Sequence, residues 1–236
     1  MSDSVTYVLD GDVAVITIDD EKANAISHAV AEAIHDGLGR ARGEAGAVAL
    51  VGRPGRFSAG FDLSVMNGPV DGARELLKTG AELAIEIYEF PQPVVIGATG
   101  HALAMGAILL LAADSRIGAE GAFKIGLPEV AIGMPLPRFA VELARDRLSK
   151  RWFTAATLHA QDFDPEAAVA AGFFDRVVPV GDVVSEAVGH AAHLAARLRK
   201  GAFVATRANT RGAVAEQLRH GLAIDVAEFV VELPGA

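Results

Sequence analysis

The stretch from Ala98 to Arg116, ATGHALAMGAILLLAADSR, constrains the fold more than any other part of this sequence. It joins an apolar run that ends in glycines to a second run, Met105 to Ala113, which has the pattern of a buried helix. The first N–H groups of a helix lack partners within the helix and lie at the positive end of its dipole. The stretch therefore predicts a backbone anion site at Ala104, Met105 and Gly106. The same pattern also fits a buried helix that binds no ligand.

Strand and helix patterns alternate through the first half of the chain, which favours an α/β layer arrangement. Asp10-Gly11 suits a hairpin turn, and Ser27 suits a helix N-cap. We expect strands within Val5 to Ile18, Ala47 to Val51 and Val94 to Ala98, and helices from Ser27 to about Gly43 and from Asp71 to Phe90.

The second half is mostly helical. Asp164-Pro165 has the pattern of an N-cap followed by the first helical residue, and Gly172 that of a helix stop. We expect short strands at Ser115 to Gly118, Ala122 to Ile125 and Val177 to Val180, a loop at Gly126 to Pro137, and amphipathic helices at Asp182 to Lys200 and Phe203 to Val231.

The chain reads as one functional domain, with a core over residues 1–180 and a helical region over residues 181–236. The apolar positions of the last helix exceed what a free tail should expose, so we expect them to pack on the core or on a neighbouring subunit. These positions are Val204, Val214, Leu218, Leu222, Val226 and Phe229.

Composition narrows the classes of function. The 236 residues are 51% hydrophobic, enough for one large core or two modest ones. The net charge of −9 argues against non-specific binding to nucleic acid or to an anionic membrane. The absence of cysteine excludes disulfides and thiolate metal sites. The longest apolar stretch, Ala102 to Ala113, is too short to span a bilayer, and the N-terminus lacks a signal-peptide pattern, so we expect a cytoplasmic protein.

Two further segments could carry chemistry. The first, RPGRFSAGFDL over Arg53 to Leu63, leaves a buried strand and turns at Ala59-Gly60, where a second set of N–H groups could be exposed. A tight surface turn explains the same glycine. The second is Glu129, whose apolar neighbours should raise its pKa towards the range of a general base. Glu129 could equally be only a polar residue at a helix start after Pro128.

Other motifs are weak. The seven histidines show no metal-binding spacing, so we assign no metal, and His101 fits a packed loop residue as well as a catalytic one. The glycines form neither a GxGxxG motif nor a P-loop, and Ser58 lies in no GxSxG elbow.

Taken together, FSAGFDL (57–63), GHALAMGAILLLAAD (100–114) and FKIGLPEVAIGM (123–134) resemble the crotonase superfamily of enoyl-CoA hydratases and isomerases. The resemblance extends from the hairpin at Val5 to AAGFFDRVVP (170–179). It implies a spiral of repeated ββα units with a helical C-terminal region, an acyl-CoA substrate, and a homotrimer or hexamer. It implies no separate cofactor, because coenzyme A is part of the substrate.

The resemblance also implies roles for individual residues. The N–H groups of Phe61 and Met105 would bind the thioester oxygen, although the family often has glycine at the second position. The CoA phosphates would need cations, for which Lys22 and residues of a neighbouring subunit are the candidates. The resemblance puts CoA and the acyl group along Lys22, Ala23, Asn24, Ala25, Ala59, Gly60, Asp62, Leu63, Gly106 and Ile108.

The carboxylates indicate the reaction. Similar hydratases have one glutamate on the first turn of the central helix and another in the later loop. Here the first position is Ile108 and only the second, Glu129, is kept, as in the Δ3,Δ2-enoyl-CoA isomerases. We therefore predict isomerisation of 3-enoyl-CoA with Glu129 as single base. Hydration of 2-enoyl-CoA and non-catalytic acyl-CoA binding remain the alternatives.

Overall fold

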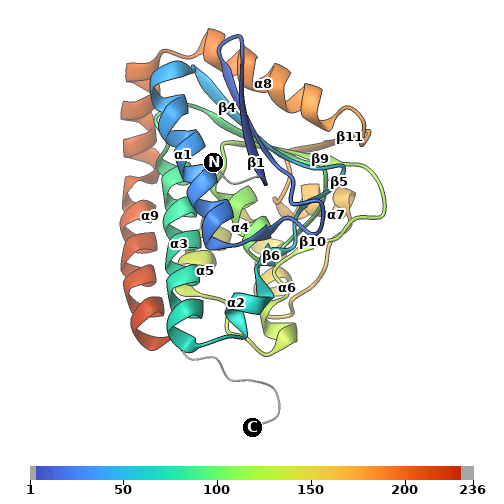
Figure 1. The fold of residues 1–236 in the computed structure, drawn as a ribbon, viewed down its shortest axis with the longest axis vertical. Helices are drawn as coiled ribbons and strands as arrows, with labels where there is room; N and C mark the ends of the chain where they lie inside the picture. Colours follow the sequence, from blue (N-terminus) through green and yellow to red (C-terminus); the bar gives the residue numbers. More distant parts are fainter. Residues whose placement is uncertain (1–3, 230–236) are drawn as a thin grey trace.

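The computed structural model describes residues 4–229, and its largest sheet has six strands in the order β1-β2-β4-β7-β9-β11 (Figure 1). Only the β1–β2 pair is antiparallel, which confirms the expected hairpin and the α/β class. Asp10 pairs with Val13, so the turn is Gly11-Asp12 rather than Asp10-Gly11. The strands are β1 (Val5–Asp10), β2 (Val13–Ile18), β4 (Ala47–Gly52), β7 (Val94–Ala98), β9 (Ser115–Ala119) and β11 (Arg176–Val178).

Helices cover both faces of this sheet. All six residues of β4 are buried. Ala49 packs towards α8 (Val183–Arg197), whereas Leu50 belongs to the main core with α1 (His28–Glu44) and α3 (Val70–Glu89). A strand covered on both faces needs apolar residues at successive positions, which explains its uninterrupted apolar sequence.

Two small parallel sheets hold the loops beside the main sheet. One consists of β5 (Gly55–Ser58), β8 (Gly100–Leu103) and β10 (Ile125–Gly126). The other pairs β3 (Ala25–Ile26) with β6 (Gly60–Phe61). The expected strand over Ala122 to Ile125 is reduced to Ile125–Gly126, where the chain pairs with both Ala102-Leu103 and Phe163.

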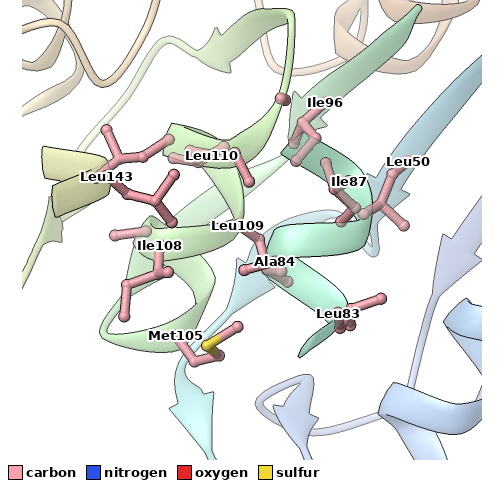
Figure 2. Close-up of a cluster of buried hydrophobic side chains, with 14 of the residues drawn as sticks. Leu50, Leu83, Ala84, Ile87, Ile96, Met105, Ile108, Leu109, Leu110 and Leu143 are labelled. Atoms are coloured by element: carbon pink, nitrogen blue, oxygen red, sulfur yellow. The ribbon is translucent and has the colours of Figure 1, made fainter. Parts of the chain in front are cut away.

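The central helix α4 (Met105–Ala112) begins at the expected residue and is buried along its whole length. Figure 2 shows its side chains in one cluster with Ala84 and Ile87 of α3 and Leu143 of α5 (Arg138–Arg147). Full burial explains why this helix has no polar face. It also means that only its first residues can meet a ligand.

The C-terminal helix α9 (Lys200–Glu228) lies along α3 and α5 of the same chain (Figure 1). Leu218 and Leu222 are buried, and Val214, Val226 and Phe229 pack partly buried against the core. Val204, near the start of the helix, does not pack on the core and is 40% exposed, so its expected contact with a neighbouring subunit stays a prediction. The expected helix end at Val231 lies outside the described residues. The remaining helices are α2 (Leu63–Met66), α6 (Lys150–Thr157) and α7 (Pro165–Ala171).

A buried ion pair fastens the start of α9 to the end of α4. Arg207 donates to Asp114 at 2.6 Å and to the carbonyl of Tyr88 at 2.8 Å, while Asp114 also accepts from the N–H of Val94. These contacts join α9, the end of α3 and the start of β7 at one point. Across residues 4–229, no helix combines the length and apolar character that crossing a membrane requires.

Candidate active site

The β3–β6 pair brings two of the expected ligand-binding segments together. Ala25 lies opposite Gly60, and the N–H of Ala59 donates to the carbonyl of Ala23 at 3.1 Å. Asn24, with φ of 52°, is fully buried, and its amide donates to the carbonyls of Ile18 and Phe57. The Asn24 side chain therefore holds the neighbouring strands together and is not available to a ligand.

Ser58 holds the turn that precedes Phe61, a role that the sequence motifs did not indicate. Its hydroxyl donates to the carbonyl of Asn24 at 2.7 Å and accepts from the N–H of Gly60 at 3.1 Å. Gly60 has φ of 100°, a conformation that favours glycine. The turn is thereby fixed without using the N–H of Phe61.

The backbone nitrogens of Phe61 and Met105 lie near each other at the junction of β6 and α4. The N–H of Asp62 donates to the carbonyl of Ile26 in β3, and successive N–H groups of a strand point to opposite sides, so that of Phe61 points away from β3. Met105 is the first residue of α4, so its N–H lacks an acceptor within the helix. Its nitrogen lies 3.4 Å from the position that a Cβ on Gly60 would occupy. The two donors are therefore neighbours.

Ala104 sets the direction of the Met105 N–H. It has φ of 49° and ψ of −123°, and no side chain caps the helix there. Non-glycine residues rarely adopt this conformation, and such strain persists only where the surroundings impose it. The N–H of Ala104 donates to the carbonyl of Gly126, which holds the residue in place where the chain enters α4.

Glu129 begins a short 3₁₀ turn, Glu129–Ile132, that ends at Gly133 with φ of 82°. It is 7% exposed, and its Oε2 atom has no hydrogen-bond partner among the described residues. Burial raises the pKa of this carboxyl to about 7, against a smaller lowering effect of its own backbone N–H. Of the neighbours expected to bury it, Val130 and Ile132 are instead exposed, because the turn directs them to solvent.

A cavity of about 630 Å³ lies between Phe61, at one of these donors, and Glu129. Glu129, Ile108 and Phe61 line it together with residues from α3, α5 and α9 that the sequence did not reveal as site residues. No local signal could have found them, because Arg138 and Asp225 are 87 positions apart and are joined only by folding. The added lining residues include Met66, Leu77, Met134, Leu136, Arg138, Asp225, Glu228 and Phe229.

Four other expected residues, Lys22, Leu63, Asp62 and Gly106, do not line this cavity. Lys22 and Leu63 are exposed, so a ligand can reach both. Asp62 caps α2 through Ser64, and those hydrogen bonds lower its pKa. Gly106 is buried against the backbone of Ser58, where a Cβ would lie 2.7 Å from the Ser58 carbonyl oxygen. Gly106 therefore allows β5 and α4 to approach closely.

His101 lies apart from this chemistry. Its Nδ1 accepts from the N–H of Lys124, and its ring meets that of Phe123 edge to face. Burial and the nearby Arg56 and Lys124 lower the pKa of this imidazole. These contacts support a packed loop residue rather than a catalytic one.

Known proteins match this architecture closely. The family profile "Enoyl-CoA hydratase/isomerase" matches residues 9–232. A probable enoyl-CoA hydratase from Rhodobacter capsulatus is 33% identical over 94% of this chain and 86% of its own length. The chain spans smaller parts of other relatives, including 54% of a probable enoyl-CoA hydratase from Bacillus subtilis and 24% of a peroxisomal multifunctional protein from Arabidopsis thaliana.

Solved structures agree. An enoyl-CoA hydratase/isomerase family protein from Pseudomonas syringae has a TM-score of 0.94 and 39% identity, covering 97% of this chain and 99% of that one. The human mitochondrial Δ3-Δ2-enoyl-CoA isomerase has a TM-score of 0.90 and 27% identity, covering 96% and 90%. Two structures of one Mycobacterium tuberculosis protein, each 39% identical, are described as an enoyl-CoA isomerase and as a probable enoyl-CoA hydratase.

The fold and these likenesses define an enzyme of the crotonase superfamily. Within it, the chain belongs to the enoyl-CoA hydratase/isomerase family. The expected family and fold are thus confirmed. The names of the relatives divide between two reactions, so the reaction must be argued from the residues of the cavity.

Proposed function

We propose that this protein converts 3-enoyl-CoA to 2-enoyl-CoA, with Glu129 as the single base and the N–H groups of Phe61 and Met105 as the oxyanion donors. The observation that carries this proposal is the buried, unpartnered carboxylate oxygen of Glu129 in a cavity where Ile108 supplies no second base. A base whose pKa lies near the working pH can both accept and return a proton.

The reaction balances with this one carboxylate. Ionised Glu129 removes a proton from C2, and the electron pair flows into the thioester carbonyl to form a dienolate. The N–H groups of Phe61 and Met105 stabilise the developing oxyanion. Glu129 then returns the proton at C4 while the double bond forms between C2 and C3. Glu129 ends the cycle ionised and no water is consumed.

The other charged groups that line the cavity pair with one another. Arg138 pairs with Asp225 at 3.3 Å and with Glu228 at 2.6 Å. Hydration would need base and acid groups arranged around one water, and this pairing supports a single available base. We further propose that CoA lies along Lys22 to Ala25 and Ala59 to Leu63, with the exposed Lys22 ammonium near its phosphates.

The substitution Glu129→Gln tests the base. It keeps the side-chain volume but removes the proton acceptor, so isomerisation should fall by at least about 100-fold while acyl-CoA binding is largely kept. Glu120→Gln, at an exposed loop residue, is the matched control and should leave the rate unchanged. Full activity in Glu129→Gln would exclude Glu129 as the base.

Hydration of 2-enoyl-CoA is the second candidate, because relatives such as the Rhodobacter capsulatus protein carry the name enoyl-CoA hydratase. Under our proposal, Ile108→Glu adds the missing carboxylate and should raise hydration above its starting level. Tight acyl-CoA binding without turnover of either substrate would instead support a non-catalytic binder.

We also propose a homotrimer or hexamer, on the strength of the family resemblance. Light scattering at working concentrations should give a multiple of three subunits. A monomer would contradict this assembly.

A further inference from the structure

The cavity proposed to hold the acyl group has a second charged part besides Glu129, formed by side chains of α5 and α9. Its wall follows the chain from Glu129, whose carbonyl accepts from the N–H of Met134, through Pro135 to Pro137 and on to Arg138, the first residue of α5. Between the two polar parts the wall is apolar, with Phe61, Met134 and Phe229 packed around the buried Met66. An acyl chain whose thioester lies at Phe61 and Met105 would therefore run along this apolar section towards Arg138.

Three charged side chains form the far part, which we call the charged end: Arg138, Asp225 and Glu228. Asp225 is 6% exposed at its side chain, and its carboxylate accepts from both Arg138 and the N–H of Phe139, at 3.3 and 3.1 Å. Glu228 accepts from Arg138 at 2.6 Å and is largely exposed, so this part of the cavity meets solvent. The three groups together carry one negative charge.

We propose that the charged end sets the acyl specificity of this protein. Lengthening an alkyl chain beyond the point where it reaches the charged end adds no further affinity. The charged end also accepts a hydrogen-bonding group, such as a hydroxyl, at the end of a chain that reaches it. This inference rests on the proposed function, which fixes the position of the thioester.

The physical reason is the hydration of the charges. A methylene gains affinity by leaving water for an apolar wall, whereas one that reaches an ion cluster displaces water from charges and gains nothing. A hydroxyl can donate to the carboxylate of Asp225 or Glu228, which have acceptor positions beyond those that Arg138 fills. A terminal carboxylate would be repelled, because the cluster is already negative.

A binding series tests this. We would measure Kd calorimetrically for saturated acyl-CoAs from hexanoyl- to hexadecanoyl-CoA with the unmodified protein. Affinity should rise roughly fourfold per methylene until the chain reaches the charged end, and then stop rising. An uninterrupted rise to the longest chain would overturn the proposal.

The variant Arg138→Met/Asp225→Asn/Glu228→Gln removes all three charges while keeping an acceptor for the N–H of Phe139. Affinity should continue to rise beyond the chain length at which it stops rising in the unmodified protein, which we call the break. A chain two methylenes longer than the break should then bind about sixteenfold more tightly to the variant than to the unmodified protein. Arg176→Met/Glu186→Gln removes an exposed ion pair of similar geometry away from the cavity and should leave the break in place. A break that stays at the same length in the triple variant would mean a steric wall and overturn the proposal.

The unmodified protein gives a test that does not depend on the triple variant folding. At the chain length of the break, an ω-hydroxyacyl-CoA should bind about fivefold more tightly than the methyl-ended chain, since one hydrogen bond contributes about 1 kcal/mol. An ω-carboxyacyl-CoA should bind more weakly than either, and Glu228→Gln should reduce that penalty. A hydroxyl that weakens binding would overturn the proposal. None of these readouts requires turnover, so a failure of the proposed isomerisation would be seen separately.

Discussion

Gly60 and Ala104 face each other so closely that a Cβ on Gly60 would lie 2.7 Å from the Cβ of Ala104. Both residues have positive φ, 100° and 49°. Their approach brings β6 against the start of α4 and so makes neighbours of the N–H groups of Phe61 and Met105. The geometry of the proposed oxyanion site therefore depends on two backbone conformations that are unusual for most residues.

Gly60→Ala should disrupt this site. The new methyl group meets Ala104 and the residue must also keep a φ unfavourable to alanine, so β6 and α4 should move apart. Loss of one oxyanion donor corresponds to a fall in kcat of about 100-fold or more. The measurement is kcat for isomerisation beside Gly39→Ala, an exposed position of α1 with no atom within 4 Å of the added methyl. Equal kcat in both variants would show that this approach does not matter.

Ala104→Gly should stabilise the protein. Glycine adopts φ of 49° with ψ of −123° without the steric cost that alanine bears. The relief of this backbone strain should outweigh the added conformational entropy of the unfolded chain. It should raise the free energy of unfolding by about 1 kcal/mol. Urea denaturation would measure it. A decrease in stability would mean that the Ala104 methyl contributes more by packing on Gly60 than it costs in strain.

Activity should fall on the acid side of neutrality. The pKa of Glu129 is raised to about 7, and the proposed base works only when ionised. The value of kcat/KM should therefore be about tenfold lower at pH 6 than on its alkaline plateau, and should continue to fall as pH drops. A pH profile of isomerisation with the unmodified protein checks this. A plateau that extends unchanged to pH 5 would rule out a titrating base with this pKa.

The same carboxyl should make stability depend on pH. Because its folded pKa, about 7, lies above the ordinary value of 4.5, its contribution to stability is complete below pH 4.5 and is lost as pH rises through 7. Glu129→Gln should therefore equal the unmodified protein near pH 4.5 and exceed it by up to about 3 kcal/mol above pH 8. Denaturant unfolding at both pH values measures the difference, with Glu120→Gln as the control. A difference independent of pH would contradict the burial of an ionised carboxylate.

The sequence predicted what depends on local pattern. The uninterrupted apolar run of β4 and the caps at Ser27 and Asp164 were correct, because each reflects a short stretch of chain. The charged end of the cavity could not be predicted, since Arg138 and Asp225 meet only when α9 folds along α5. Val204 was predicted to pack on the core or on a neighbouring subunit, and periodicity alone could not show that it lies exposed on the chain itself.

The roles of some individual side chains could not be predicted from the sequence pattern either. Asn24 lies within a segment assigned to ligand binding, yet its amide is buried and bonded to strand carbonyls. Ser58 matched no catalytic motif, and its hydroxyl fixes the turn before Phe61. Such side chains satisfy backbone groups that other segments leave unpaired, and those partners become identifiable only in the folded chain.

The central claim is that one base, Glu129, moves a double bond without water. The most direct measurement compares two rates for the purified, unmodified protein over a range of chain lengths: isomerisation of 3-enoyl-CoA and hydration of 2-enoyl-CoA. Our account predicts that isomerisation is faster at every chain length that the protein accepts. Faster hydration would contradict it, and would mean that a group other than residue 108 supplies the second proton-transfer site.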